Sequence, residues 1–467
     1  MHRTPAPWRS AWRAAHALTS KVSISGMSGL ARQAPRMPAE WEPHAGTWIG
    51  WPDSPFNWRQ QARPAQLAFG AVAEAIAMYE PVTVCTTAAS WLSARTQLPQ
   101  HIRVVELSAN DYWLRDTGPT FLVSHPPVDP KAATCLPGCQ SPGPATPCPP
   151  TTSHTHQGST WASAYPGLRA ALNPPPPNAT PAGVGAAAAA AAAGAAGQGP
   201  EGTGVIACCW AFNAYGQKYA DVGSLDAMIG VRVANVAGLP AVQPNLVLEG
   251  GSIHVDGEGT LLTTEECLLH PNRNPNCSKE DIEAQLKRWL GVAKVLWLPK
   301  GLYADHDTNG HVDNFACFAR PGVVLLAWTD DSSDPQHQIS RQALEILQGM
   351  TDAAGRTLQV VKLPLPPPLF RTEEECEGLE EDPMASDMYR KPGQRLAASY
   401  VNFFIANGAV VMPAFGVLED EVAKAVLQEQ FPGRVVIAVP SREVLLGGGN
   451  IHCITCQQPG GVPVGAA

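Results

Sequence analysis

Cys453 is the residue whose setting is best suited to chemistry. It ends the stretch Gly447-Gly-Gly-Asn450-Ile-His452-Cys453, in which three glycines and two polar residues lead to the thiol. Consecutive glycines cost backbone entropy, so a triplet after an apolar, strand-like run indicates close approach of the backbone to another group. A cysteine attacks as the thiolate and needs a base or a cation beside it. We interpret Cys453 as a nucleophile; the alternative is a buried, inert thiol.

Cys456 completes a C-x-x-C pair with Cys453. Such a pair can be a redox centre or half of a metal site. A structural zinc site needs two further ligands at matching spacing, and the sequence contains no second C-x-x-C. The pattern therefore favours a single working thiol and no metal.

His311 and Asp313 are the best candidates for acid–base chemistry. They are two residues apart, so in an extended strand both side chains share one face. A histidine and a carboxylate aimed at the same space make a general acid/base beside a cation anchor. A solvated strand edge is the alternative. A metal site of His311 with Asp305, His306 and Asp307 ranks below the acid–base interpretation.

Two more carboxylates lie in unusual places. Asp116 belongs to the loop Trp113-Leu-Arg-Asp-Thr-Gly-Pro119 between two predicted strands, where it pairs with Arg115, caps a turn or does chemistry. Glu249 interrupts an apolar run and needs a polar centre to face. Asp116, Glu249, Asp313 and Asp307 cannot all be ionised in one dry pocket unless a cation binds there. A planar guanidinium, with its fork of N–H donors, suits two carboxylates.

The elements that position these residues alternate between helix and strand, which predicts an α/β fold. Helices are expected at 65–79, 278–290, 339–350 and 420–430, and strands at 82–85, 102–107, 295–298, 323–328, 358–363 and 435–438. The helix at 278–290 opens with a capping box formed by Ser278 and Asp281. Short polar strands are predicted at 252–256, 311–315, 400–404 and 450–453, the first and third opening hairpins. Their recurrence indicates a pseudo-symmetric repeat fold whose polar edges face a common centre.

Composition limits the function further. The net charge of −9 argues against a nucleic-acid partner and is compatible with a cationic substrate. No apolar run is long enough to cross a bilayer, so no membrane partner is expected. The twelve cysteines lack the dense spacing of a secreted scaffold, and we expect reduced, mostly buried thiols in an intracellular enzyme.

The chain divides into a folded part and three unusual segments. Residues 1–36 are basic and contain no Asp or Glu, as in a transit peptide; an unstructured cytosolic leader is the alternative. The location is accordingly cytoplasmic, or plastid or mitochondrial if the leader is a transit peptide. Within the folded region 37–460, residues 125–204 are rich in Pro, Ala, Ser and Gly and predict a disordered insertion. Residues 461–467 form a tail.

Taken together, these stretches closely resemble the agmatine deiminase family, in its plant-type branch. The matching motifs are Met37-Pro-Ala-Glu-Trp41, Trp48-Ile-Gly-Trp-Pro52, Trp113-Leu-Arg-Asp-Thr-Gly-Pro119, Leu248-Glu-Gly-Gly-Ser-Ile-His254, Asp307-Thr-Asn-Gly-His-Val-Asp313 and Gly447-Gly-Gly-Asn-Ile-His-Cys453. The resemblance covers about residues 37–124 and 205–460. It implies the pentein fold, a single-domain, five-bladed α/β propeller with pseudo-fivefold symmetry and an active site on its axis.

The resemblance also implies a reaction, the hydrolysis of agmatine to N-carbamoylputrescine and ammonia in putrescine biosynthesis. It makes Cys453 the nucleophile that forms an amidino-thioether, with Asp116 and Asp313 holding the guanidinium. His311 protonates the departing ammonia and then deprotonates water, and Glu249 orients His311. Trp113 and Asp307 match positions that line the substrate channel. No metal or organic cofactor is implied, the partner is the small molecule agmatine, and a homo-oligomer is compatible with the resemblance.

Some features depart from the family, and rival functions remain. Cys456 stands where the resemblance leads us to expect glutamine, and the segment 210–229 is shorter than its counterpart. A deiminase of free or peptidyl arginine is the rival within the enzymes, and it needs a basic residue at the far end of the channel. A pseudoenzyme should have lost Cys453, His311, Asp116 or Asp313, and all are present.

Overall fold

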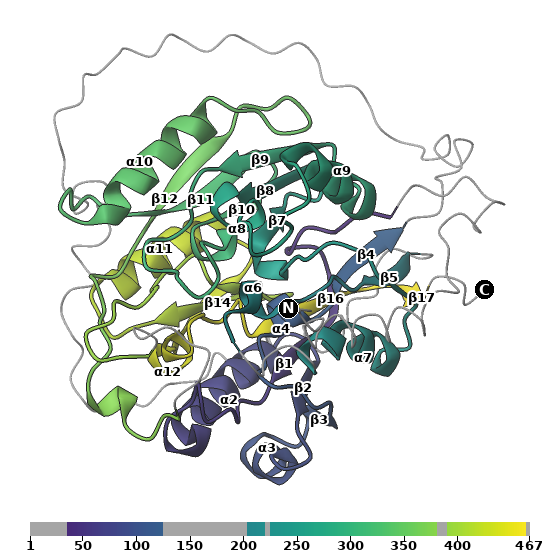
Figure 1. The fold of residues 1–467 in the computed structure, drawn as a ribbon, viewed down its shortest axis with the longest axis vertical. Coiled ribbons are helices and arrows are strands. Elements are labelled where there is room, and N and C mark those ends of the chain that lie inside the picture. Colours follow the sequence, from purple (N-terminus) through teal and green to yellow (C-terminus); the bar gives the residue numbers. More distant parts are fainter. Residues whose placement is uncertain (1–34, 125–202, 220–224, 381–389, 464–467) are drawn as a thin grey trace, which may run out of the picture. The chain divides into compact units, whose positions relative to one another are not determined.

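The computed structural model describes residues 35–124, 203–219, 225–380 and 390–463 (Figure 1). The predictions for the leader at 1–36 and the insertion at 125–204 therefore fall almost entirely outside the described residues, and so do residues 464–467 of the predicted tail at 461–467. Within the described ranges, no helix combines the length and the apolar character that crossing a membrane requires. The nine cysteines in these ranges are all free thiols, and seven of them are buried.

The described strands form five separate sheets with one shared pattern (Figure 1). In each sheet an antiparallel pair of strands is extended by a parallel third strand. Three sheets are formed by consecutive strands: β7 (Ile253–Val255), β8 (Thr260–Thr264) and β9 (Lys294–Leu298); β10 (Ala316–Arg320), β11 (Val323–Trp328) and β12 (Gln359–Pro364); β13 (Phe404–Ile405), β14 (Ala409–Ala414) and β15 (Val435–Pro440).

The other two sheets join distant parts of the chain. One consists of β16 (Thr455–Pro459), β1 (His44–Gly50), β2 (Val82–Thr86) and β3 (Arg103–Glu106), so that a C-terminal strand pairs with the first strand. The other consists of β4 (Thr120–Ser124) and β5 (Gly204–Cys208), with β6 (Ala241–Val242) and β17 (Val462–Pro463) both paired to β5. The chain is thus α/β, as predicted, and the same unit of strands recurs in all five sheets.

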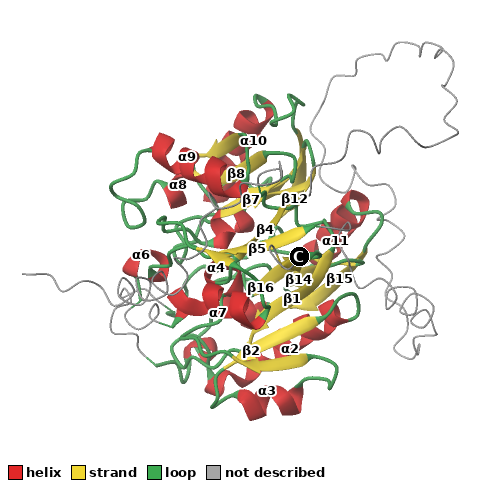
Figure 2. Ribbon diagram, turned by 90° about the vertical axis from the view of Figure 1, so that its right-hand side faces the viewer, coloured by secondary structure: helices red, strands yellow, loops and turns green. Residues whose placement is uncertain are grey.

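Each parallel crossover contains a helix, because a parallel connection cannot be made by a tight turn. These helices are α2 (Arg63–Ala77), α3 (Trp91–Gln97), α7 (Ile229–Val236), α9 (Lys279–Leu290), α10 (Pro335–Gln348) and α11 (Glu419–Gln430). In Figure 2, α9, α10, α11 and α2 lie toward the periphery of the view while the strands gather toward its middle.

Local signals explain where the helices begin and end. Ser278 and Asp281 form the predicted capping box of α9, and Gly291 ends the helix with a left-handed φ of 66°. The helix α10 begins at Pro335, earlier than the predicted residue 339, because Asp334 caps it and Pro335 suits the first helical position.

A core cluster around α2 and β1 fixes the position of Cys453. Phe69, Val72 and Ile76 of α2 pack in it with Ile49 of β1, and Cys453 belongs to the same cluster. The thiol is therefore held by packing on one side, and its mobility is limited before any polar contact is counted.

The predicted strands at 311–315 and 450–453 are wrong. Residues Val312–Asn314 form a 3₁₀ helix, η8, because the side chains of Asp305 and Thr308 accept the His311 backbone N–H that a strand partner would need. Residues 451–454 form turns ahead of β16, and a short helix, α12 (Arg442–Leu446), precedes the glycines in place of a strand. The predicted strand at 252–256 is confirmed as β7, whereas the one at 400–404 is reduced to β13.

Candidate active site

The candidate residues come from the segments directly ahead of the first strands of the sheets. Asp116 lies on α4 (Leu114–Thr117) ahead of β4, and Glu249 precedes η7 (Gly250–Ser252) ahead of β7. His311 and Asp313 lie at η8 ahead of β10, and Cys453 lies in the turn ahead of β16. The short elements α4, η7 and η8 are in contact with one another in that order. The repeated strand unit thus delivers one polar segment per sheet to a shared location.

Cys453 is 2% exposed and its sulfur is surrounded by polar groups. The thiol donates to Asp313 Oδ2 at 3.5 Å, and Asn402 Nδ2 donates to the sulfur at 3.1 Å. Burial raises the pKa of the Cys453 thiol well above its usual value, and the charges of Asp313 and Asp116 raise it further. The sulfur therefore stays protonated until a cation enters between the two carboxylates.

The three glycines before Cys453 form a wall of the pocket, as their sequence predicts. A Cβ on Gly447 would lie 2.1 Å from the Trp58 ring, and one on Gly448 would lie 2.2 Å from Asp307 Oδ2. A Cβ on Gly449 would lie 2.9 Å from the Cys453 sulfur. Each approach leaves no space for a side chain, and Gly448 also has a φ of 108° that favours glycine.

His311 is fully buried between two carboxylates. Its Nδ1 lies 3.7 Å from Asp116 Oδ1, and its Nε2 lies 3.8 Å from Glu249 Oε2. These distances are longer than hydrogen bonds, as is common at catalytic groups before substrate binds. Burial opposes the imidazolium, but the Asp116 charge, followed by Cys267 and Glu249, raises the pKa of His311 well above its usual value. His311 therefore holds a proton that it can donate.

Glu249 is ionised despite complete burial. Burial would raise its pKa, but the adjacent Arg273, whose Nε donates to Glu249 Oε1 at 2.8 Å, and then His311 lower the pKa of Glu249 to about 2. The Arg273 guanidinium also donates to Asn309 Oδ1 at 2.6 Å and to the Thr308 backbone oxygen at 2.9 Å. Arg273 thus ties Glu249 to the loop that leads to His311.

Asp116 faces the same space from the opposite side. Its Oδ1 accepts the Gly251 backbone N–H at 2.9 Å, and its Oδ2 accepts the Tyr215 hydroxyl at 3.0 Å. Burial, with Asp313 and Glu249, raises the pKa of Asp116 to about 6 against the opposing charge of His311. A Cβ on Gly251 would lie 2.7 Å from His311 Nδ1, 2.8 Å from Asp313 Oδ2 and 2.9 Å from Asp116 Oδ1, so the three side chains meet above this glycine.

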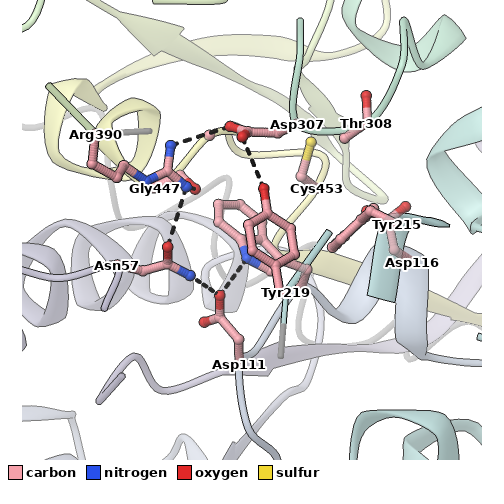
Figure 3. A pocket seen from close by; sticks show the side chains of 13 residues that line it. Asn57, Asp111, Asp116, Tyr215, Tyr219, Asp307, Thr308, Arg390, Gly447 and Cys453 are labelled. Atoms are coloured by element: carbon pink, nitrogen blue, oxygen red, sulfur yellow. Dashed lines mark hydrogen bonds and ion pairs between the residues drawn. The ribbon is translucent and has the colours of Figure 1, made fainter. Parts of the chain in front are cut away.

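A pocket is lined by Cys453 and by the two predicted channel residues, Trp113 and Asp307. Cys453 and Asp307 are labelled in Figure 3. Asp307 Oδ1 accepts the Tyr219 hydroxyl at 2.9 Å, and Asp307 Oδ2 pairs with Arg390 Nη1 at 3.1 Å. Trp113 Nε1 donates to Asp111 Oδ2 at 2.7 Å. The remaining lining is formed by Asn57, Asp111, Asp116, Tyr215, Thr308 and Gly447–Gly449.

The metal site considered from the sequence does not form. His306 is exposed, and the Asp305 carboxylate is engaged by the Thr308 hydroxyl and the Asn314 amide. Among the described residues, one other group could approach a metal: donor atoms of Glu249, Cys267 and His311 lie within 4.8 Å of one another. The Arg273 guanidinium bonded to Glu249 opposes a second cation there, so these residues fit a protonated His311 better than a metal.

The sulfurs of the C-x-x-C pair have different surroundings. Cys456 lies on β16, and its thiol donates to the Pro119 backbone oxygen at 3.4 Å, whereas Cys453 contacts Asp313 and Asn402. Both are free thiols.

Sequence reasoning missed three polar contacts of the site: Arg273, Tyr215 and Asn402. The recurrence of a polar strand at 400–404 was the one signal for Asn402, since it marks the segment ahead of a first strand. Besides donating to the Cys453 sulfur, Asn402 accepts the backbone N–H groups of His452 and Cys453 through Oδ1, at 3.0 and 3.3 Å. Asn402 therefore both fixes the turn and stabilises a thiolate.

Asn402→Ala is expected to lower kcat by about 10- to 100-fold, the value of a hydrogen bond to a charged group. The rate at which a haloacetamide alkylates Cys453 should fall as well, because the thiolate loses a donor. Asn407→Ala is the matched control, since Asn407 also bonds backbone groups, both at His44, but makes no contact with the sulfur. It should lower the melting temperature and leave the alkylation rate unchanged; an equal loss of rate in both variants would assign Asn402 a structural role only.

Comparison with known proteins agrees with this geometry. The family model of the Porphyromonas-type peptidyl-arginine deiminases matches residues 36–135 and 195–459. An agmatine deiminase of Medicago truncatula is 45% identical over 429 residues, which cover 91% of this chain and 96% of that protein. One of Ectopseudomonas mendocina is 43% identical over 435 residues, covering 92% of this chain and 96% of that protein. The structure of the Enterococcus faecalis agmatine deiminase superposes with a TM-score of 0.72 at 32% identity, covering 91% of this chain and 96% of that one.

Five like α/β sheets that bring a cysteine, a histidine and carboxylates together define the class, that of the peptidyl-arginine deiminase-like proteins of the pentein superfamily. Within this class the chain belongs to the agmatine deiminase family, as its motifs predict.

Proposed function

We propose that the protein hydrolyses agmatine to N-carbamoylputrescine and ammonia, as a hydrolase of putrescine biosynthesis. The observation that carries the proposal is the meeting of Asp116, Asp313 and His311 above Gly251, with the Cys453 thiol on Asp313. Two carboxylates close to a nucleophile suit a planar guanidinium, which can donate to both at once. Membership of the agmatine deiminase family supports the same substrate.

Binding of the guanidinium prepares the nucleophile. Asp313 and Asp116 accept its N–H groups and place its carbon near the Cys453 sulfur. The new positive charge offsets the carboxylates that keep the thiol protonated, so the thiol loses its proton to water and becomes a thiolate. Asn402 donates to the resulting sulfur anion.

Two half-reactions follow. The sulfur bonds to the guanidinium carbon, and the C–N bond then breaks as His311 gives its proton to the departing nitrogen, which leaves as ammonia. The neutral His311 next takes a proton from water while the water oxygen attacks the amidino-thioether carbon. The C–S bond breaks, its electron pair returns to sulfur, the sulfur takes the remaining proton from the product oxygen, and the neutral urea product leaves. Glu249 keeps His311 oriented throughout and balances its charge.

We also propose that the five sheets are the blades of a propeller with pseudo-fivefold symmetry, in which the loops ahead of the first strands face the axis. The shared strand pattern of the sheets and the pairing of β16 with β1 support this arrangement. It accounts for why five segments far apart in sequence supply one site.

Asp307→Asn is expected to raise the KM for agmatine by about 10-fold, because the carboxylate lining the pocket attracts the substrate's ammonium group, although its ion pair with Arg390 weakens this attraction. The effect on kcat should be smaller, since this contact is the same in the ground state and the transition state. Butylguanidine, which lacks the ammonium, serves as the control substrate: its KM should be unchanged by Asp307→Asn. An equal rise for both substrates would show that Asp307 acts on the pocket's shape.

A second substrate deserves a direct test because of Arg390. An arginine deiminase needs a basic residue in the channel to bind the α-carboxylate, and Arg390 lines this pocket. Its guanidinium is engaged by Asp307, Asn57 and the Gly447 backbone oxygen, which reduces its attraction for a further anion. The function is therefore tested by measuring ammonia release from agmatine, free arginine and a peptidyl-arginine in parallel. Turnover of agmatine alone is expected; preference for an arginine would overturn the substrate but keep the cysteine chemistry.

A further inference from the structure

Glu40 and His452 take no part in the reaction as described, yet both are buried beside it, with 4% and 3% of their surface exposed. His452 Nδ1 lies 2.9 Å from Asp313 Oδ2, and His452 Nε2 lies 2.8 Å from Glu40 Oε1. We propose that Glu40 and His452 are positioning residues that hold Asp313 ionised and aimed at the substrate's guanidinium. The inference rests on the proposed function in that Asp313 is the group that binds the cation.

The two carboxylate contacts of His452 require a proton on each of its ring nitrogens. An imidazole with a carboxylate oxygen at each ring nitrogen can donate to both only as the imidazolium. Burial and the nearby Arg115 oppose this charge, but Glu40 and Asp313 outweigh them and raise the pKa of His452. The pKa of Asp313 is lowered in turn: burial would raise it, but the hydrogen bond and the charge of His452 prevail.

Glu40 is itself held as an anion by its neighbours. Besides His452, it faces Arg115 Nη1 at 3.3 Å and His254 Nε2 at 3.5 Å. The other ring nitrogen of His254 accepts the Phe318 backbone N–H at 3.2 Å, so its proton lies on the nitrogen that faces Glu40. Although burial opposes ionisation, His452, Arg115 and His254 keep the pKa of Glu40 well below its usual value. The charges of this buried group therefore sum to zero, since it contains two carboxylates (Glu40 and Asp313), one imidazolium (His452) and one guanidinium (Arg115).

The contacts of Asp313 within the protein use only one of its two carboxylate oxygens and leave the other for the substrate. His452 and the Cys453 thiol both contact Oδ2. Asp313 Oδ1 is buried and has no hydrogen-bond partner among the described residues. An unpartnered, buried carboxylate oxygen is costly unless a ligand completes it. His452 therefore orients the carboxylate by one oxygen so that the other is available to a guanidinium N–H.

The proposal is tested by how strongly the site favours a cationic reagent over a neutral one of the same shape. Chloroacetamidine and chloroacetamide both alkylate Cys453 with loss of chloride, but only the amidinium is recognised by an ionised, correctly aimed Asp313. The ratio of the two alkylation rates therefore reports on Asp313 and is independent of the fraction of folded protein. In Glu40→Gln and His452→Asn this ratio should fall about tenfold or more relative to the wild-type protein.

Glu80→Gln is the matched control. Glu80 is also a buried carboxylate paired to a histidine, His44, at 3.1 Å, and the other nitrogen of His44 contacts the backbone oxygen of Glu40. Like Glu40→Gln, Glu80→Gln replaces a buried glutamate by glutamine and disturbs the segment around Glu40, but it leaves the side chain of Glu40 in place. It should lower the melting temperature and keep the wild-type ratio. A ratio that falls equally in Glu80→Gln, or stays at the wild-type value in Glu40→Gln and His452→Asn, overturns the proposal.

Spectra of the wild-type protein and of His311→Gln provide a second test if Glu40→Gln and His452→Asn do not fold. In ¹⁵N spectra of the histidine-labelled protein at pH 8, His452 should appear as an imidazolium, identified as the charged signal that survives in His311→Gln. Its absence overturns the proposal. The positioning role of Glu40 and His452 and the proposed function can be refuted separately. A protein that releases no ammonia from agmatine, but whose ratio of alkylation rates falls in Glu40→Gln and His452→Asn, would overturn only the proposed function.

Discussion

Cys453→Ser is expected to lower kcat for agmatine by about 10⁴-fold or more while changing KM little. The hydroxyl is a much weaker nucleophile than a thiolate, and no described base lies within hydrogen-bond distance of the sulfur except the Asp313 carboxylate, at 3.5 Å. The carboxylates that hold the guanidinium are unaffected, so binding should persist. Steady-state ammonia release measures kcat, and calorimetric titration of the inactive variant with agmatine measures the affinity.

Cys456→Ser is the control for this substitution. Cys456 is as buried as Cys453, and a serine hydroxyl can replace its thiol as donor to the Pro119 backbone oxygen. A nucleophilic mechanism requires only Cys453, so Cys456→Ser should keep near wild-type turnover. A redox or metal function of the C-x-x-C pair requires both sulfurs. Equal loss of activity in the two variants would therefore contradict the single nucleophile, as would ammonia release by Cys453→Ser at the wild-type rate.

Much of the fold could be predicted because many of its helices and strands have a local signal. The capping box at Ser278 marks the start of α9, and the β-branched run of β11 marks a buried strand. The repeat was visible as recurring hairpins. The closing of one sheet by β16 and β1 was not, since this pairing joins residues about 400 positions apart and depends on no local pattern.

The site, like the fold, could be predicted from local sequence only in part. Residue types and motifs singled out Cys453, His311 and Asp313, and the structure brings them together. The strand geometry assumed for His311 and Asp313 was wrong, because the side chains of the preceding loop bind the backbone that a strand would use. They share a face all the same, through one turn of 3₁₀ helix.

The partners of the site residues were hard to foresee for a physical reason. Arg273 reaches Glu249 from a turn that has no periodicity, and Glu40 reaches His452 across 412 residues. Such contacts are set by tertiary packing, and the motif Met37-Pro-Ala-Glu-Trp41 contains Glu40 but gives no indication of its partner. A buried carboxylate predicts that a cation must be near it but not which one.

The second large effect is expected at His311. His311→Gln should lower kcat by about 10²- to 10⁴-fold, because an amide cannot donate a proton to departing ammonia or take one from water. Alkylation of Cys453 by chloroacetamidine releases chloride and needs no proton transfer to the leaving group, so its rate should change far less. The contrast between the two rates separates acid–base catalysis from binding.

The pH dependence of the reaction provides an independent test of the roles of His311 and Asp116. His311 must be protonated to act as the acid, and its raised pKa means that activity is lost only as pH rises through that value. Asp116 must be ionised to hold the guanidinium, and kcat/KM should fall as pH drops through about 6, the pKa of Asp116. In His311→Gln the alkaline limb should disappear while the acid limb remains.

His306→Gln is the matched control for His311→Gln, since it makes the same substitution on an exposed histidine of the same loop. It should keep both limbs of the profile and the wild-type rate. If His306→Gln lost activity as well, the loop would act as a unit, in the way the rejected metal site requires. An alkaline limb that survived in His311→Gln would assign the titrating acid to another group and remove His311 from the proton transfer.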